Sequence, residues 1–188
     1  TDGCDCTCDS GWTGSDCDEQ EFTICGNTYT QGSINNNSVT NGTCQIISAD
    51  WSVDTYDISD SVTDIYFWLG SGTGYTATFN AANVQNFTVL IGSGGGHTLN
   101  VNYGGTAPTV YNNPSGYGSL TGSATVNLTD VSCDYSDCNY NGSTSDLDST
   151  DGCDCTCDSG WTGSDCDEQE FTICGNTYTQ GSINNNSV

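Results

Sequence analysis

The sequence of 188 residues contains no lysine and no arginine, while 24 residues are acidic, so the formal net charge is −24. Proteins bind nucleic-acid backbones mainly through Lys and Arg, and the same residues attract proteins to anionic lipid surfaces. Many phosphoryl-transfer sites also use Lys or Arg to hold the phosphate groups. Composition therefore excludes nucleic acids, anionic membrane surfaces and this kind of phosphoryl transfer.

Long apolar runs and catalytic motifs are missing as well. The sequence has no apolar run of about 18 residues, the length that predicts a membrane-spanning helix. It begins at Thr1 without a recognisable signal peptide, which we interpret as a mature or internal segment. The only histidine is His97, and no nucleophile–base pattern accompanies it, so we expect a structural or surface role for His97 and no enzymatic activity.

The sequence does contain a perfect repeat. Residues 1–39 recur unchanged as residues 150–188, at an offset of 149. We interpret the chain as one period of 149 residues followed by the start of the next, taken from a longer tandem array. Identical units joined head to tail generate a fibre rather than a closed particle.

Cysteine is abundant for a chain of this length. The 13 cysteines are an odd number, but one period of 149 residues holds eight, at positions 4, 6, 8, 17, 25, 44, 133 and 138. The Cys4-x-Cys6-x-Cys8 spacing is not typical of zinc sites, so we favour disulfides. Disulfides at this density predict an extracellular or cell-surface location.

The cysteine spacing is regular only when it is followed across the start of the second copy. Residues 133–166 run Cys-x4-Cys-x14-Cys-x-Cys-x-Cys-x8-Cys, and the last 12 of them read CTCDSGWTGSDC. This segment resembles the EGF-like module, whose closing half has the pattern C-x-C-x2-G-aromatic-x4-C. The position of Cys153, one residue from Cys155, departs from the family.

The resemblance implies a first–third, second–fourth, fifth–sixth pairing. It gives the pairs Cys133–Cys153, Cys138–Cys155 and Cys157–Cys166, with Cys8–Cys17 as the earlier copy of the last. Cys25 and Cys44 are then left to pair with each other. Cys4, Cys6 and Cys174 would have partners outside these 188 residues.

Alternating apolar residues dominate the region between the cysteine-rich segments. Residues 60–132 contain short period-two stretches bounded by Gly, Ser and Asn, which predict half-buried strands; in the first, Ile65, Phe67 and Leu69 point one way and Asp64, Tyr66 and Trp68 the other. Residues 69–80 align with residues 91–102 at an offset of 22, with six of twelve positions identical and His97 aligned with Tyr75. A period near 22 favours a parallel β-helix, and an antiparallel β-sandwich is the alternative.

These patterns divide the chain into four parts. We expect the end of an EGF-like module over 1–24, an all-β domain over 25–132 with its strongest signal over 60–132, a second EGF-like module over 133–170, and the start of the next β domain over 171–188.

Acceptor sequences for N-linked glycans are frequent. The Asn-x-Ser/Thr pattern occurs at Asn36, Asn41, Asn86, Asn127, Asn141 and Asn185. The side chains of Asn86 and Asn127 are expected to point outward from predicted strands, so that a glycan would face water. Glycans would supply the hydration that charged side chains supply elsewhere.

Acidic residues concentrate near the second copy, where residues 146–170 hold nine of them. Without Lys or Arg their repulsion must be relieved by solvent screening or by a bound cation, and calcium is the natural candidate. The ligands we consider are Asp130, Asp146, Asp148 and Asp151. A solvated acidic surface with no bound metal is the equally weighted alternative, and no cofactor is required.

We conclude from sequence that the chain is a structural repeat unit of a secreted, glycosylated filament or surface appendage, similar in outline to EGF-like proteins of flagellar hairs and to adhesins. Its partners would be copies of itself and N-linked glycans, with no nucleic acid and no membrane insertion. The alternatives are an adhesin stalk that binds carbohydrate or a receptor, and, less well supported, a polysaccharide lyase or hydrolase.

Overall fold

The computed structural model describes residues 6–30, 32–34, 39–149, 152–179 and 182, which form strands and turns without an α-helix. Within this described part of the chain, no helix could cross a membrane. The chain divides into two compact units, Thr1–Thr129 and Asp130–Val188, and each is described by itself.

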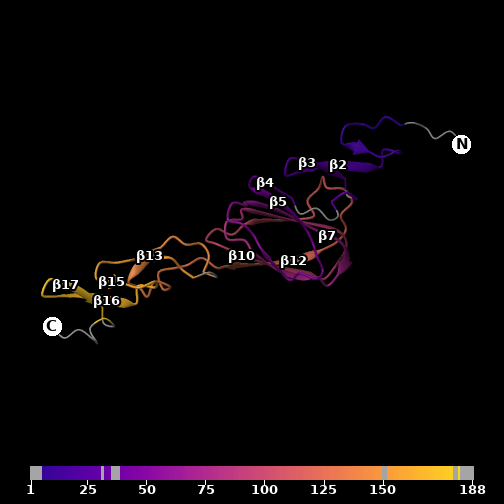
Figure 1. Ribbon diagram of the computed structural model, residues 1–188. Coiled ribbons are helices and arrows are strands. Elements are labelled where there is room, and N and C mark those ends of the chain that lie inside the picture. The colour runs from indigo at the N-terminus through magenta and orange to yellow at the C-terminus, as the bar shows by residue number, and fades with distance from the viewer. Residues whose placement is uncertain (1–5, 31, 35–38, 150–151, 180–181, 183–188) are drawn as a thin grey trace. The chain divides into compact units, whose positions relative to one another are not determined.

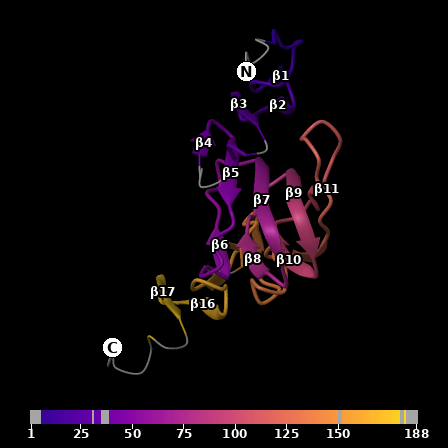
Figure 2. The ribbon, with the colours of Figure 1, turned by 90° about the vertical axis from the view of Figure 1, so that its right-hand side faces the viewer.

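The first unit is built around a β-solenoid, in which the chain coils through two sheets in turn (Figure 1). One sheet has the order β11 (Thr109–Asn112), β9 (Asn86–Gly95), β7 (Asp64–Thr73), β5 (Cys44–Ser48) and β4 (Val39–Asn41), and Figure 2 shows its strands side by side. The other has the order β12 (Ala124–Asp130), β10 (His97–Tyr103), β8 (Thr76–Asn80) and β6 (Thr55–Asp57). Successive coils pair in parallel, as β7–β9 and β8–β10 do, which confirms the β-helix-like prediction over the sandwich.

The register shows the period that the sequence predicted. Ile65 pairs with Phe87 and Asn80 pairs with Asn102, a step of 22 residues in each case. The first coil departs from it, because Cys44 pairs with Asp64 at a step of 20 and Thr55 pairs with Thr78 at a step of 23. This coil lies before residue 60, where the repeat is weak in the sequence.

The inward side chains form an apolar core between the two sheets. Ile65, Phe67, Phe79 and Phe87 are all 0% exposed. The ring centroids of Phe67 and Phe79 lie 4.8 Å apart and those of Phe79 and Phe87 lie 5.0 Å apart, both edge to face. Burial of this apolar area is the main force that holds the coils together.

Glycines allow the turns of neighbouring coils to stack closely. Gly72 pairs with Gly94, and a Cβ on Gly94 would overlap the carbonyl oxygen of Gly72. Gly94 also has φ near +99°, a conformation that other residues rarely adopt. The Gly-Ser-x-Gly repeat is therefore required by the approach of one coil to the next.

One face of the first sheet differs from the prediction. Trp68 was expected on the outward side of a half-buried strand, yet it is only 5% exposed, and its neighbour on the next coil, Leu90, is 0% exposed. A hairpin of β2 (Glu19–Ile24) and β3 (Asn27–Thr30) supplies the cover, because Phe22 and Ile24 belong to the same apolar cluster. Strands β7 and β9 are thus buried on both faces at this point.

Strand β1 (Trp12–Thr13) pairs with β2 and extends the hairpin to a three-stranded sheet of order β1, β2, β3.

The second unit has little apolar core and is built on disulfides. Strand β13 (Gly142–Thr144) pairs antiparallel with β14 (Cys155–Cys157). A second sheet has the order β15 (Trp161–Thr162), β16 (Glu168–Ile173) and β17 (Asn176–Thr179). Cys138 and Cys166, both 0% exposed, lie at the centre of the small module.

Candidate functional site

The repeated segment, which we define as residues 6–30 in the first copy and residues 155–179 in the second, folds in the same way twice from Trp12 and Trp161 onward, whereas Cys155–Cys157 form β14 and their counterparts, residues 6–8, form no strand. Trp12 pairs with Gln20 as Trp161 pairs with Gln169. The hairpins that follow have the same register in both copies. The local fold is therefore set by the segment's own sequence, and differences between the copies come from what each one contacts.

Five disulfides are present among the described cysteines. They are Cys8–Cys17, Cys25–Cys44, Cys133–Cys153, Cys138–Cys155 and Cys157–Cys166, the same five pairs that the sequence analysis expected. The three bridges of the second unit follow the order that the EGF-like resemblance implied, whereas membership of that family stays a prediction. Their number places the chain in an oxidising compartment.

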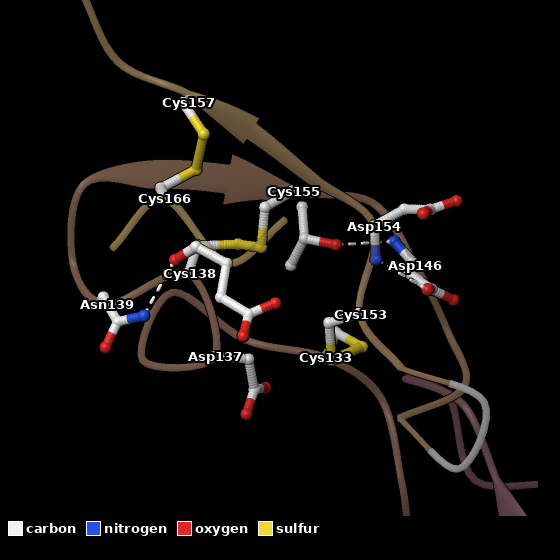
Figure 3. Close-up of a disulfide and its surroundings, with 12 residues drawn as sticks. Cys133, Asp137, Cys138, Asn139, Asp146, Cys153, Asp154, Cys155, Cys157 and Cys166 are labelled. Atoms are coloured by element: carbon white, nitrogen blue, oxygen red, sulfur yellow. Dashed lines mark hydrogen bonds between the residues drawn. A yellow bond between two sulfur atoms is a disulfide. The ribbon is translucent and has the colours of Figure 1, made fainter. Parts of the chain in front are cut away.

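Two of these bridges cross from the first period into the second copy. Cys133 and Cys138 precede residue 150, and their partners Cys153 and Cys155 follow it (Figure 3). Around them Asn139 donates a 2.8 Å hydrogen bond from Nδ2 to the backbone oxygen of Asp165. Residues 133–149 and the repeated segment thus form one folded module.

The first copy of the segment lacks these contacts. Cys6, the counterpart of Cys155, is an exposed thiol, and Cys17 is half-buried although its counterpart Cys166 is 0% exposed. Cys174, the counterpart of Cys25, is also an exposed thiol. Cys4 lies outside the described residues.

At the hairpin end of the segment it is the first copy that is buried and the second that is exposed. Ile24 is 1% exposed because it packs on the solenoid, whereas its counterpart Ile173 is 48% exposed. The first copy is fixed to the solenoid by the Cys25–Cys44 bridge and by a 2.8 Å hydrogen bond from Asn41 Nδ2 to the backbone oxygen of Cys25. The segment therefore has two contact surfaces, one for a disulfide module and one for a solenoid, and each copy here uses one of them.

Two of the four predicted calcium ligands, Asp130 and Asp146, accept hydrogen bonds from the backbone. Asp146 accepts hydrogen bonds from the backbone N–H groups of Asp148, at 3.0 Å, and Asp154, at 3.1 Å, one on each carboxylate oxygen. Asp130 accepts one from the N–H of Ser132 at 3.0 Å. Asp151 lies outside the described residues. These backbone donors hold the pKa of Asp146 below its ordinary value.

Asp130, Asp146 and Asp148 do not converge on one point. Among the residues that the structure describes, the one group of three potential metal ligands within reach of one another is Cys133, Asp137 and Cys153. The two cysteines are joined in a disulfide, so their sulfurs are not thiolates. Because Asp151 lies outside the described residues, the calcium site stays a prediction.

The described glycan acceptors differ in exposure. Asn127 on β12 and Asn41 are exposed, whereas Asn86 and Asn141 are half-buried. Asn86 donates a 2.8 Å hydrogen bond from Nδ2 to Asp64, and Asn141 donates one of 3.2 Å to the backbone oxygen of Cys166. Asn36 and Asn185 lie outside the described residues. The amide of Asn127 donates a 2.9 Å hydrogen bond to Oδ1 of Asn100, so by exposure Asn41 and Asn127 are the more accessible of the described positions for a glycan.

A polar groove of about 680 Å³ lies in the first unit between the repeated segment and the turns of the solenoid. Trp12, 45% exposed, lines it together with Asp18 and Glu19. The opposite wall carries serines from stacked turns, including Ser71 and Ser93. An exposed indole beside carboxylates and hydroxyls is a surface on which a neutral sugar can stack and form hydrogen bonds. No pattern in the sequence indicated this groove.

His97 lies inside the solenoid rather than on its surface. It is 1% exposed, and its Nδ1 accepts a 3.2 Å hydrogen bond from the backbone N–H of Tyr75. Its ring lies edge to face with Trp51 at 6.2 Å between centroids. These contacts give His97 a role in fixing one coil to the next.

Comparison of the chain with protein-family profiles, with curated proteins and with solved structures finds no match.

Proposed function

We propose that the chain is a structural unit of a secreted, glycosylated filament in which solenoids and disulfide modules alternate along a tandem array. The observation that carries the proposal is the pair of bridges Cys133–Cys153 and Cys138–Cys155, which link the end of one period to the beginning of the next copy. A module that needs residues from two consecutive periods is a joint between units. Repetition of a unit with such a joint produces an extended fibre.

The composition supports the same proposal. A chain with no Lys or Arg offers no cleavage site to trypsin-like proteases, which suits an exposed appendage. Disulfides stabilise small modules by about 2–4 kcal/mol each through restriction of the unfolded chain. Glycans on exposed acceptors such as Asn127 would keep neighbouring fibres hydrated.

Electron microscopy of the native material tests the proposal. We expect uniform filaments whose density repeats along the axis once per 149-residue unit, with solenoid and module alternating. Dispersed single units in native material would contradict it.

A second candidate function, a carbohydrate-binding adhesin, is favoured by the groove beside Trp12. Titration of the chain with neutral oligosaccharides, followed by tryptophan fluorescence, tests it. Trp12→Ala should abolish any binding, and Trp161→Ala is the matched control because Trp161 has the same local sequence and does not line this groove. Equal effects of the two substitutions would exclude this groove as the site.

A further inference from the structure

We infer that hairpin β16–β17 binds the solenoid of a second copy of this chain, at the surface that hairpin β2–β3 covers in its own unit. The inference rests on the proposed function, since it names the contact that would join neighbouring units. It is argued from the second hairpin, whose apolar side chains have no solenoid to cover them among the described residues.

The two hairpins are the same binding element in two states. Both have the sequence EQEFTICGNTYT, over residues 19–30 and 168–179. Phe22 pairs with Tyr29 in the first, and Phe171 pairs with Tyr178 in the second. The free hairpin already has the conformation of the bound one, so little conformational entropy is lost when it docks.

The receiving surface is apolar and well defined. It consists of Ile34, Ile46, Trp68 and Leu90, each 5% exposed or less when the first hairpin covers them. Ile24 contributes the deepest apolar contact of the hairpin, at 1% exposed, whereas Ile173 is 48% exposed. Docking of the second hairpin would remove the apolar surface of Ile173 from water and return that of Ile24 to water. Exchange of one hairpin for the other is therefore close to neutral in free energy, and protein concentration drives it toward linked chains.

The position of Cys174 adds a covalent step. Cys25 has φ near +49° at the tip of its hairpin, where it bonds to Cys44, and Cys174 has φ near +51° at the same tip. A docked second hairpin would therefore present its sulfur to Cys44 as Cys25 does. The Cys174 thiolate attacks the sulfur of Cys44, the Cys44–Cys174 bond forms, and Cys25 leaves as a thiolate that takes up a proton, with no net oxidation.

The wild-type chain tests the inference directly. We expect a concentrated sample at mildly alkaline pH, with a low concentration of reduced glutathione, to form head-to-tail oligomers. Mass spectrometry of peptides should find Cys44 bonded to Cys174 of another chain, and the linked fraction should rise with protein concentration. Cys6 is an internal control, because it is an exposed thiol too and random exchange would link it to Cys44 equally often.

Two variants separate docking from chance contact. Ile173→Ser should reduce the linked fraction roughly tenfold or more, since it removes the apolar anchor of the free hairpin at a position where folding of the monomer does not depend on it. Ile24→Ser should raise the linked fraction, because it weakens the resident hairpin. If Ile24→Ser does not fold, the comparison of the linked fraction between the wild type and Ile173→Ser still tests the inference.

Three results would overturn the inference: no Cys44–Cys174 bond at any concentration, an equal yield in Ile173→Ser, or a Cys44–Cys174 bond confined to single chains. Each of them would leave the filament proposal standing if native filaments still repeat once per unit. Conversely, exchange in solution without native filaments would support docking and refute the filament.

Discussion

Asn102 donates a 2.8 Å hydrogen bond from Nδ2 to Oδ1 of Asn80, which occupies the same place one coil earlier. Asn80 in turn donates a 2.7 Å hydrogen bond from its Nδ2 to the carboxylate of Asp57. The three side chains form a ladder along one edge of the solenoid, and the carboxylate at its end only accepts. The ladder holds the coils in register independently of the apolar core.

Replacement of the middle residue should break the ladder. Asn80→Asp removes the donor to Asp57 and places two carboxylates side by side, so we expect a loss of about 1–2 kcal/mol in the free energy of unfolding. Asn80→Ala is the matched control without the added charge, and it should cost less than Asn80→Asp. Urea unfolding measures the free energy of unfolding of both variants. Equal values would contradict the expected repulsion between the carboxylate at residue 80 and that of Asp57.

The two copies of the repeated segment allow a matched pair of core substitutions. Ile24→Ala should destabilise the solenoid by about 2–5 kcal/mol, because it removes a buried side chain from the cluster around Trp68. Ile173→Ala changes the same residue in the same local sequence at an exposed position, and should have almost no effect. Thermal unfolding followed by tryptophan fluorescence checks both. A similar effect of the two substitutions would contradict the finding that hairpin β2–β3 covers the solenoid and that hairpin β16–β17 does not.

The carboxylate of Asp146 should make the second unit sensitive to acid. Its folded-state pKa is lowered by hydrogen bonds from the backbone N–H groups of Asp148 and Asp154. The ionised form therefore stabilises the fold above the unfolded-state pKa of about 4, and this contribution is lost as the pH falls through the lower folded-state pKa. The melting temperatures of the wild type and Asp146→Asn should differ at pH 7 and converge near pH 2. A difference in melting temperature that does not depend on pH would show that the ionised carboxylate of Asp146 does not stabilise the fold.

Removal of divalent cations should leave the second unit unchanged. Both carboxylate oxygens of Asp146 already accept backbone hydrogen bonds, and Oδ1 of Asp130 accepts one from the N–H of Ser132. We therefore expect the same melting temperature with excess calcium and with EDTA. A rise in melting temperature with calcium, lost in Asp146→Asn, would show a site that includes this carboxylate.

Much of the fold could be predicted because the solenoid repeats its chemistry at a fixed interval. The shared pattern of residues 69–80 and 91–102 gave the coil length, and the alternation around Phe67 gave the inward face. The first coil was hidden because its steps are 20 and 23 residues, and because β6 has only three residues.

The buried outer face was missed for a different reason. Apolar neighbours such as Trp68–Leu69 and Leu90–Ile91 break the alternation, and that break is the signal that both faces of a strand are covered. What covers them is a hairpin more than 35 residues earlier, which no local pattern reveals. The calcium ligands were considered because carboxylates concentrate in the sequence, whereas the backbone donors that engage Asp146 depend on the folded loop and could not be predicted.

The account's central claim is that the repeated segment completes a disulfide module on one side and covers a solenoid on the other. Alkylation of native material without reduction, followed by digestion at acidic residues and mass spectrometry, tests it most directly. The account predicts that every peptide containing Cys6 or Cys155 is bonded to a Cys138 peptide, in addition to the Cys17 or Cys166 peptide that Cys8 or Cys157 holds. It also predicts that Cys25 and Cys174 occur only bonded to Cys44 or its equivalent. Abundant alkylated thiols in those peptides would contradict it.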